Sequence, residues 1–245
     1  MAGIEIVTTS DRPDLDDQAR AAFLGEWPEF IFHDPVVTAH IGRVEQYFPR
    51  YDIMLLNDGE VVAGGWGVPL RWDGEAATLP EGYDGAMVSS VTEHENGTEP
   101  DTLSVMAAAV KHGRQGQGLA GQVLSALRER ALADGLSRVI APVRPTLKNR
   151  YPLTAMTDFA GWTRPDGQHL DPWIRTHQRL GASVLGPAPR SMLITGTVAE
   201  WEDWAKMAFP QTGSYVVPAA LDLVQIDREQ DRGTYEETNL WMRHV

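Results

Sequence analysis

Residues 104–135 read SVMAAAVKHGRQGQGLAGQVLSALRERALADG and contain the pattern that decides the fold. Ser104 to Val110 is a short apolar run, as expected of a buried strand, and a polar turn with glycines follows from Lys111 to Gly118. Apolar residues then recur with the helical period, at Leu119, Ala120, Val123, Leu124, Leu127 and Ala131. Gly135 stands where a left-handed residue commonly ends a helix. The stretch therefore predicts a strand, a glycine turn and a helix in direct succession.

The predicted turn presents its backbone N–H groups at the N-terminus of the helix. The helix dipole makes that end partly positive, and its unpaired N–H groups can donate to an anion. Glycine lets the backbone approach a phosphate closely because it carries no side chain. Lys111 and Arg114 add positive charge on either side. We therefore expect a phosphate or pyrophosphate here rather than an ordinary helix start.

Two anion-binding motifs fit the same letters, and the first is the dinucleotide fingerprint Gly116-x-Gly118-x-x-Gly121. That fingerprint needs its first glycine directly after the strand and an acidic residue after the next strand. Here five residues separate Val110 from Gly116, and the strand predicted over residues 138–143 is followed by Arg144. An NADP-binding oxidoreductase could use that arginine, but no further strand–helix–strand series follows.

The second motif is Gln115-x-x-Gly118-x-Ala120, which resembles the Q/R-x-x-G-x-G/A signature of the GNAT superfamily of acyl-CoA-dependent N-acetyltransferases. A strand ending in valine precedes it and a long amphipathic helix follows, as in that family, so we prefer this interpretation. The resemblance implies an α/β protein with a mixed, α+β-type sheet. The expected architecture is a GNAT-like acyl-CoA N-acyltransferase fold with an inserted loop and a C-terminal extension.

The resemblance also implies which residues hold the donor, acetyl-CoA or another acyl-CoA, with no metal. The backbone of Ala108, Ala109 and Val110 would bond the pantetheine arm. The N–H groups that would hold the pyrophosphate belong to Gln115, Gly116, Gln117, Gly118, Leu119 and Ala120. Further candidates, for the outer phosphates and for a contact after the next strand, are Lys111, Arg114, Lys148 and Asn149.

Acyl transfer to an amine needs an acid for the leaving thiolate and a base for the amine. Residues 176–182, THQRLGA, resemble the family's L-Y-x-K-L-G-F segment and place His177 at the tyrosine. His177 is therefore predicted to be the general acid, the alternative being a space-filling histidine on a helix face. The turn between the first two helices offers four candidate bases, Glu26, Glu29, His33 and Asp34. A water chain leading to a backbone carbonyl is the alternative base.

Residues 1–197 are predicted to form the acetyltransferase domain, with residues 145–170 as an inserted lid or loop. Residues 198–245 are predicted to be a C-terminal extension packed on the same domain, with an aromatic helix over 201–209. A helix capped by Asp171 is expected to run to Leu180, and strands near 183–185 and 192–197 would complete the sheet. The insertion and the loop 26–34 are expected to close two sides of one acceptor pocket.

The 245-residue chain has no cysteine and a net charge of −13. The absence of cysteine excludes a disulfide framework and a thiol nucleophile. The acidic balance argues against a nucleic-acid partner, which needs a basic face. The segment from Thr102 to Arg150, however, contains eight Lys and Arg residues and two Asp and Glu residues, a net charge of +8 − 2 = +6. Such a basic segment suits a polyanionic cofactor. We see neither a signal peptide nor a membrane-spanning run, and expect a cytoplasmic protein with no membrane partner.

The leading hypothesis is an acyl-CoA-dependent N-acyltransferase, most simply an N-acetyltransferase, that moves an acyl group from a thioester to an amine of a small molecule. Three alternatives remain open at this point. The donor could be the phosphopantetheine of an acyl carrier protein, the protein could be a non-catalytic acyl-CoA sensor, or it could be an NADP-binding oxidoreductase.

Overall fold

The computed structural model describes residues 3–23, 25 and 27–244. Within these residues, nine strands form one mixed sheet with the order β1-β2-β3-β4-β5-β9-β8-β7, and β6 pairs with β9. The strands are β1 (Glu5–Thr8), β2 (Asp52–Asn57), β3 (Glu60–Leu70), β4 (Thr102–Val110), β5 (Arg138–Val143), β6 (Ser183–Gly196), β7 (Gly213–Tyr215), β8 (Val224–Asp227) and β9 (Arg232–Arg243). Only β4 and β5 pair in parallel, so the predicted mixed sheet is confirmed.

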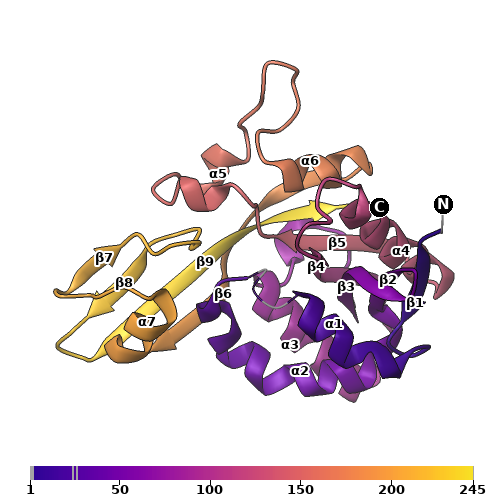
Figure 1. Ribbon diagram of the computed structural model, residues 1–245, viewed down its shortest axis with the longest axis horizontal. Helices are drawn as coiled ribbons and strands as arrows, with labels where there is room; N and C mark the ends of the chain where they lie inside the picture. Colours follow the sequence, from indigo (N-terminus) through magenta and orange to yellow (C-terminus); the bar gives the residue numbers. More distant parts are fainter. Residues whose placement is uncertain (1–2, 24, 26, 245) are drawn as a thin grey trace.

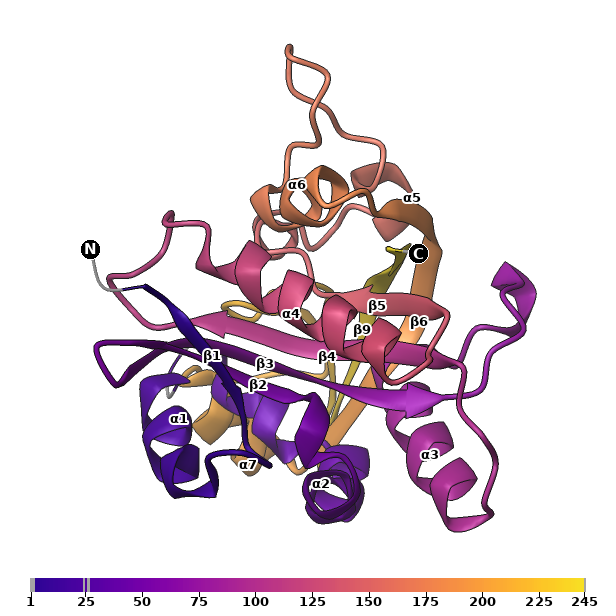
Figure 2. The same cartoon turned by 90° about the vertical axis from the view of Figure 1, so that its right-hand side faces the viewer.

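Helices cover both faces of the sheet. They are α1 (Asp16–Phe23), α2 (Pro35–Tyr47), α3 (Gly82–Glu95), α4 (Leu119–Ala133), α5 (Met156–Phe159), α6 (Pro172–Arg179) and α7 (Val198–Ala205). Figures 1 and 2 show α4 and α6 on one face and α1, α2 and α3 on the other. The main core lies between these layers, where α4 buries Val123, Leu124 and Leu127 against the strands.

Helix starts follow the residues that dictate them. Asp34 caps α2 by accepting from the Val36 and Val37 N–H groups at 2.7 and 3.1 Å, with Pro35 at the first helical position. Asp171 caps α6 in the same way, as predicted. In both cases a carboxylate satisfies N–H groups that lack an acceptor within the helix.

The strands β4 and β5 fork. They pair only through Thr102–Ser104 and Arg138–Ile140, although β4 continues to Val110. Against β3, the register of β4 shifts between Trp66 and Gly67, so that Met106 is bulged out of the ladder. A bulge bends a strand and increases its twist. Beyond Ser104, this edge of β4 therefore has no partner among the described strands.

The tail differs from the predicted extension. Its last strand, β9, lies in the interior of the sheet. Along one edge β9 pairs with β5 and β8, and along its other edge it pairs with β6. The tail also supplies β7 and β8 and forms a second core in which Trp201, Phe209 and Tyr235 are buried. The sheet is thus not complete at residue 197. Strand β9 could not be predicted from the sequence, because the buried positions of β9 include Gly233, Glu237 and Asn239 and so lack the alternation of apolar and polar residues typical of a strand.

The insertion does not meet the loop 26–34. Residues 145–170 lie beside α6, on the face opposite α1 and α2 (Figures 1 and 2). Their aromatic rings pack together, with Tyr151 4.8 Å from Trp162 between ring centroids. Phe30 packs instead against Trp201 and Tyr235 of the second core. The prediction that residues 145–170 and the loop 26–34 close one acceptor pocket is therefore wrong.

Candidate active site

The glycine turn before α4 has the backbone that an anion site requires. Gly116 and Gly118 have φ angles of 79° and 77°, in the left-handed region, and nothing lies within 4 Å of where their Cβ atoms would be. The N–H of Gln122 donates to the Gly118 carbonyl at 3.2 Å and begins the helical ladder. The N–H groups just before it belong to the first turn, which has no intrahelical acceptor. Gln115 braces the turn by accepting from the Gly113 N–H at 2.8 Å.

The fork fits a pantetheine arm. Ala108, Ala109 and Val110 pair with β3 on one edge, and their other edge lies past the last β4–β5 pair. At the point where the strands part, the buried hydroxyl of Ser104 has no hydrogen-bond partner among the described residues. An extended amide chain could satisfy backbone groups along that edge. The residues present therefore suit acyl-CoA, with the pyrophosphate at the turn and the arm along β4.

Three of the cations predicted for the outer phosphates already have protein partners. Lys111 pairs with Glu60, and Arg114 lies 3.7 Å from the same carboxylate. Lys148 is fully buried, and its ammonium donates to the Leu221 and Tyr151 carbonyls at 2.6 and 3.1 Å. The prediction that Lys148 binds phosphate is therefore wrong.

Asn149 lies in the short turn η5 (Lys148–Arg150), and its Oδ1 is buried without a partner among the described residues. Its predicted contact with the cofactor stays a prediction.

His177 lies on α6, buried, with its ring 4.4 Å from that of Trp173 between centroids. Its Nδ1 is 2.9 Å from Nε2 of His244, so each donor or acceptor role depends on the tautomers. Burial, and then the neighbouring His244, lower the pKa of His177 to about 3. The ring is therefore neutral at physiological pH, which contradicts the imidazolium that the predicted general acid requires.

The candidate bases separate. Glu26 lies outside the described residues. Glu29 and His33 belong to the surface turn η2 (Glu29–His33), where their side chains pair at 3.3 Å. The His33 ring stacks on Trp204 of α7 at 4.2 Å. These two thus form a surface pair, whereas Asp34 points into the protein.

Asp34 meets a carboxyl group that the sequence analysis did not single out. Asp34 is fully buried, and its side chain interacts with that of Asp84, in the first turn of α3. Burial raises the pKa of both groups, and the charge of Asp34 contributes to raising that of Asp84 to about 8. The contact of Asp84 with Asp34 could not be predicted from local sequence, because α3 has little apolar periodicity and the two residues are 50 positions apart.

A second buried network adjoins this pair. Glu237 of β9 is fully buried and accepts from Arg144 Nε at 2.9 and 3.0 Å, from the Tyr235 hydroxyl and from the Asn239 amide at 2.8 Å each. Asn239 accepts in turn from Ser191 of β6, whose oxygen also receives the Tyr83 N–H at 2.8 Å. Glu237 is thus fully satisfied, and its charge contributes to raising the pKa of Asp34 and Asp84.

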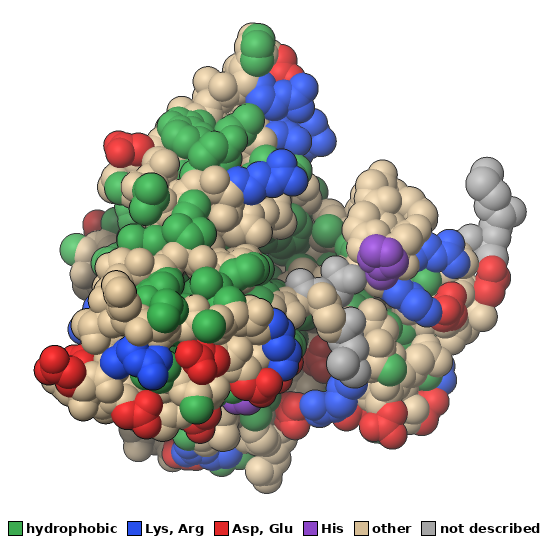
Figure 3. Space-filling view, turned by 60° about the vertical axis from the view of Figure 1, so that its left-hand side comes forward, with side chains coloured by type: hydrophobic (Ala, Val, Ile, Leu, Met, Phe, Trp, Pro, Cys, Tyr) green, Lys and Arg blue, Asp and Glu red, His purple; other side chains and the backbone are tan. Residues whose placement is uncertain are grey.

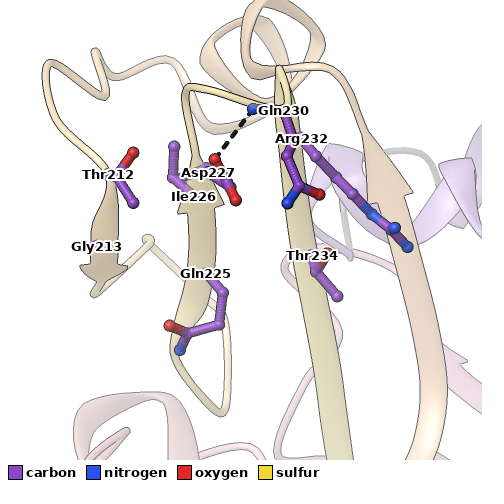
Figure 4. A pocket seen from close by; sticks show the side chains of 8 residues that line it. All are labelled: Thr212, Gly213, Gln225, Ile226, Asp227, Gln230, Arg232 and Thr234. Atoms are coloured by element: carbon purple, nitrogen blue, oxygen red, sulfur yellow. Dashed lines mark hydrogen bonds between the residues drawn. The ribbon is translucent and has the colours of Figure 1, made fainter.

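The surface is hollowed on the face shown in Figure 3. A separate depression of about 390 Å³ lies over β7, β8 and β9 (Figure 4). Its lining is polar, and Asp227 there is occupied by the Glu229 and Gln230 N–H groups at 3.0 Å. That depression belongs to the tail and not to the fork.

The described residues contain no group of three or more acidic, histidine or cysteine side chains placed to hold a metal ion. In the same part of the chain, every helix is too short or too polar to cross a membrane.

Comparison with known proteins agrees with this geometry. No family model matches the chain. The chain is 29% identical, over 276 aligned positions, to the arginine N-acetyltransferase avaD of Aspergillus versicolor, covering 99% of this chain and 94% of that protein. The loading GNATL domain of CurA from Lyngbya majuscula superposes with a TM-score of 0.56 at 13% identity, over 100% of this chain and 97% of that domain. The GNAT-like decarboxylase GphF, solved with isobutyryl-CoA, gives 0.50 at 18% identity, over 76% and 88%.

The forked sheet and the glycine turn at the head of α4 belong to a fold that the chain shares with these GNAT structures. Over nearly its whole length the chain is also similar in sequence to an N-acetyltransferase.

Proposed function

We propose that this protein acetylates a small amine of the arginine class, using acetyl-CoA. The chain is an acyl-CoA-dependent N-acyltransferase whose co-substrate is an acyl-CoA and whose acceptor is a small-molecule amine. The choice of arginine-like acceptors draws on the activity named for the relative in Aspergillus versicolor. The observation that carries the proposal is the fork between β4 and β5 beside the open glycine turn.

The turn and the strand have separate tasks in this proposal. The N–H groups from Gln115 to Ala120 hold the pyrophosphate at the positive end of α4. The free edge of Ala108 to Val110 holds the pantetheine arm, so that the thioester extends toward Ser104 at the point where the strands part. Acetyl-CoA supplies the activated acyl group. The chain then contributes mainly by positioning, which alone can account for a large part of the rate of a two-substrate reaction.

The test is release of free thiol from acetyl-CoA in the presence of an amine panel containing arginine, agmatine and diaminobutyrate, with the acetylated product identified by mass spectrometry. We expect thiol release that depends on the amine. Binding of acetyl-CoA without acceptor-dependent release would leave the sensor hypothesis in its place.

A second donor is favoured by one observation. Lys111, Arg114 and Lys148, the cations predicted for the outer phosphates, all have protein partners. A carrier protein's phosphopantetheine lacks the 3′-phosphate of coenzyme A and makes no demand on them. Comparing kcat/KM for acetyl-CoA, its 3′-dephospho form and an acetylated carrier protein separates the donors. Equal use of the two free thioesters, with faster use of the carrier, would favour the carrier protein.

A further inference from the structure

The carboxyl groups of Asp34, which is fully buried, and Asp84, which is half-buried, each have one oxygen with a hydrogen-bond partner and one buried oxygen without. In Asp34, one oxygen accepts from the α2 backbone and Oδ2 has no partner among the described residues. In Asp84, Oδ2 accepts from the Leu193 N–H at 3.1 Å and Oδ1 has no partner within the same part of the chain. The backbone of α2 and β6 therefore fixes both groups, and their remaining oxygens are left for each other. Both are acceptors, so they form no hydrogen bond unless one carries a proton.

The surroundings of the pair add negative charge. Glu237 on β9 contributes a buried carboxylate, and the pKa of Tyr83 on α3 is raised first by burial and then by the charges of both aspartates. Arg144, which directly follows β5, is already bonded to Glu237. Because burial and mutual repulsion disfavour two negative charges, the pair holds a proton at neutral pH. A ligand that brings a positive charge and hydrogen-bond donors would replace that proton.

We propose, resting on the N-acyltransferase function above, that Asp34 and Asp84 bind the distal cation of the acceptor, a guanidinium held between the two carboxylates. A guanidinium presents five N–H donors in a planar fork and can bond two carboxylates at once. Asp34 is fully buried but Asp84 is half-buried, so the ligand approaches from the side of α3. Tyr83, the residue before Asp84, packs edge to face with Trp66 at 6.2 Å between ring centroids, and aromatic rings attract cations.

This assignment also fixes which nitrogen is acylated. A guanidinium held by carboxylates stays protonated and has no lone pair to offer. The nitrogen that receives the acyl group is therefore the amine at the other end of the acceptor.

A competing acidic pocket is better satisfied internally. A cavity of about 130 Å³ between α1, α2 and the strands is lined by Asp16, Glu45 and Asp52. Arg20 bonds both Asp16 and Glu45, and Thr9 donates to Asp52 at 2.6 Å. Its acids thus already have partners, unlike the facing oxygens of Asp34 and Asp84.

The experiment compares arginine with citrulline, in which a neutral ureido group of nearly the same shape replaces the guanidinium. We expect the wild-type kcat/KM for arginine to exceed that for citrulline by at least about 30-fold, the effect of hydrogen bonds to charged groups. Asp84→Asn keeps an oxygen for the Leu193 N–H and should reduce that ratio to near one, with acetyl-CoA affinity unchanged. Asp203→Asn, which alters an exposed carboxylate of α7, is the control and should leave the ratio as it is.

A measurement on the wild-type protein does not depend on any variant folding. Calorimetry of arginine binding in two buffers of different ionisation enthalpy should show release of about one proton, expelled from the pair by the guanidinium. Equal use of arginine and citrulline, or a ratio that survives in Asp84→Asn, would overturn the proposal. If no amine in the panel accepts an acyl group, the proposed function itself fails, and that outcome is seen separately in the thiol assay.

Discussion

Nδ1 of His177 lies 2.9 Å from Nε2 of His244, and this contact joins α6 to the residue that follows strand β9. The backbone N–H of His244 also donates to Val139 of β5 at 2.8 Å. The pKa of His177 is lowered to about 3, first by burial and then by His244, and that of His244 to about 4, first by burial and then by Arg128. Both rings are therefore neutral at physiological pH.

This pair makes folding stability depend on acid. In the unfolded chain a histidine takes up a proton near pH 6.5, whereas these two do so only near pH 3 to 4 when folded. As the pH falls, protons thus bind the unfolded state first. The free energy of unfolding should be level above about pH 6.5 and should decrease below it, by about 1.4 kcal/mol per pH unit for each histidine. Urea unfolding between pH 7.5 and 5 measures this slope.

Matched variants test the source of that slope. His244→Asn should reduce the slope by about half, since one of the two titrating rings is gone and His177 remains. His112→Asn, on the exposed glycine turn, should not change it. An unchanged slope in His244→Asn would show that other groups carry the acid sensitivity.

The same neutrality bears on catalysis. A general acid with a pKa near 6.5 would make the rate fall as the pH rises through that value. Because His177 is already deprotonated there, we expect kcat to show no such fall between pH 6 and 7.5. An NMR titration of the His177 ring should place its midpoint below pH 5. A decline in kcat that His177→Phe abolishes, under conditions where chemistry limits the rate, would restore His177 as the acid.

If the glycine turn binds the pyrophosphate of acetyl-CoA, Gly118→Glu should lose acetyl-CoA binding and keep the fold. The new side chain enters open space, so the fold should survive, but its carboxylate would stand where the pyrophosphate binds. The positive φ also strains any side chain, by about 1 kcal/mol, and Gly118→Ala measures that cost alone. We expect acetyl-CoA affinity to fall at least about 100-fold in Gly118→Glu, equivalent to about 2.7 kcal/mol. Gly97→Glu, at another open left-handed position, is the control and should bind normally.

Local pattern predicted the local parts of this fold. The strand, turn and helix over residues 104–135 and the capped helix α6 each depend on residues close together in sequence, and all are present. Helix α3 begins at Gly82, where the Tyr83 N–H donates to the hydroxyl of Ser191, a residue more than 100 positions away in sequence. The pairing of β9 with β5 and the meeting of Asp34 with Asp84 depend on distant segments, which no periodicity records.

Lys148 was predicted to bind an outer phosphate from the family resemblance, but in the structure its ammonium bonds protein carbonyls. The strands β5 and β8 both pair along one edge of β9, and Lys148 bonds the Leu221 carbonyl just before β8. We therefore expect Lys148→Met to leave acetyl-CoA affinity within about twofold while reducing the free energy of unfolding by about 1–3 kcal/mol, since two carbonyls lose their donor. Calorimetry and urea unfolding report the two quantities. A large loss of acetyl-CoA affinity in a stably folded variant would return Lys148 to the donor site.

The last prediction compares two arginine–glutamate pairs that both involve β9. Arg144 bonds the fully buried Glu237 through Nε, and Arg190 lies 3.5 Å from the exposed Glu236. Removing one partner of a buried pair leaves the other charge without compensation, at a cost of about 3–5 kcal/mol, whereas exposed pairs contribute about 0–1 kcal/mol.

Arg144→Met should therefore destabilise the protein by several kcal/mol, and Arg190→Met by less than about 1 kcal/mol, in urea unfolding. The double variant Arg144→Met with Glu237→Gln should recover part of the loss, because the unpaired charge is then gone. Since the charge of Glu237 also contributes to raising the pKa of Asp34 and Asp84, Glu237→Gln alone should lower both values. Calorimetric proton release on arginine binding should then shrink at neutral pH. Release that stays at one proton in Glu237→Gln would show that this carboxylate does not act on the aspartate pair.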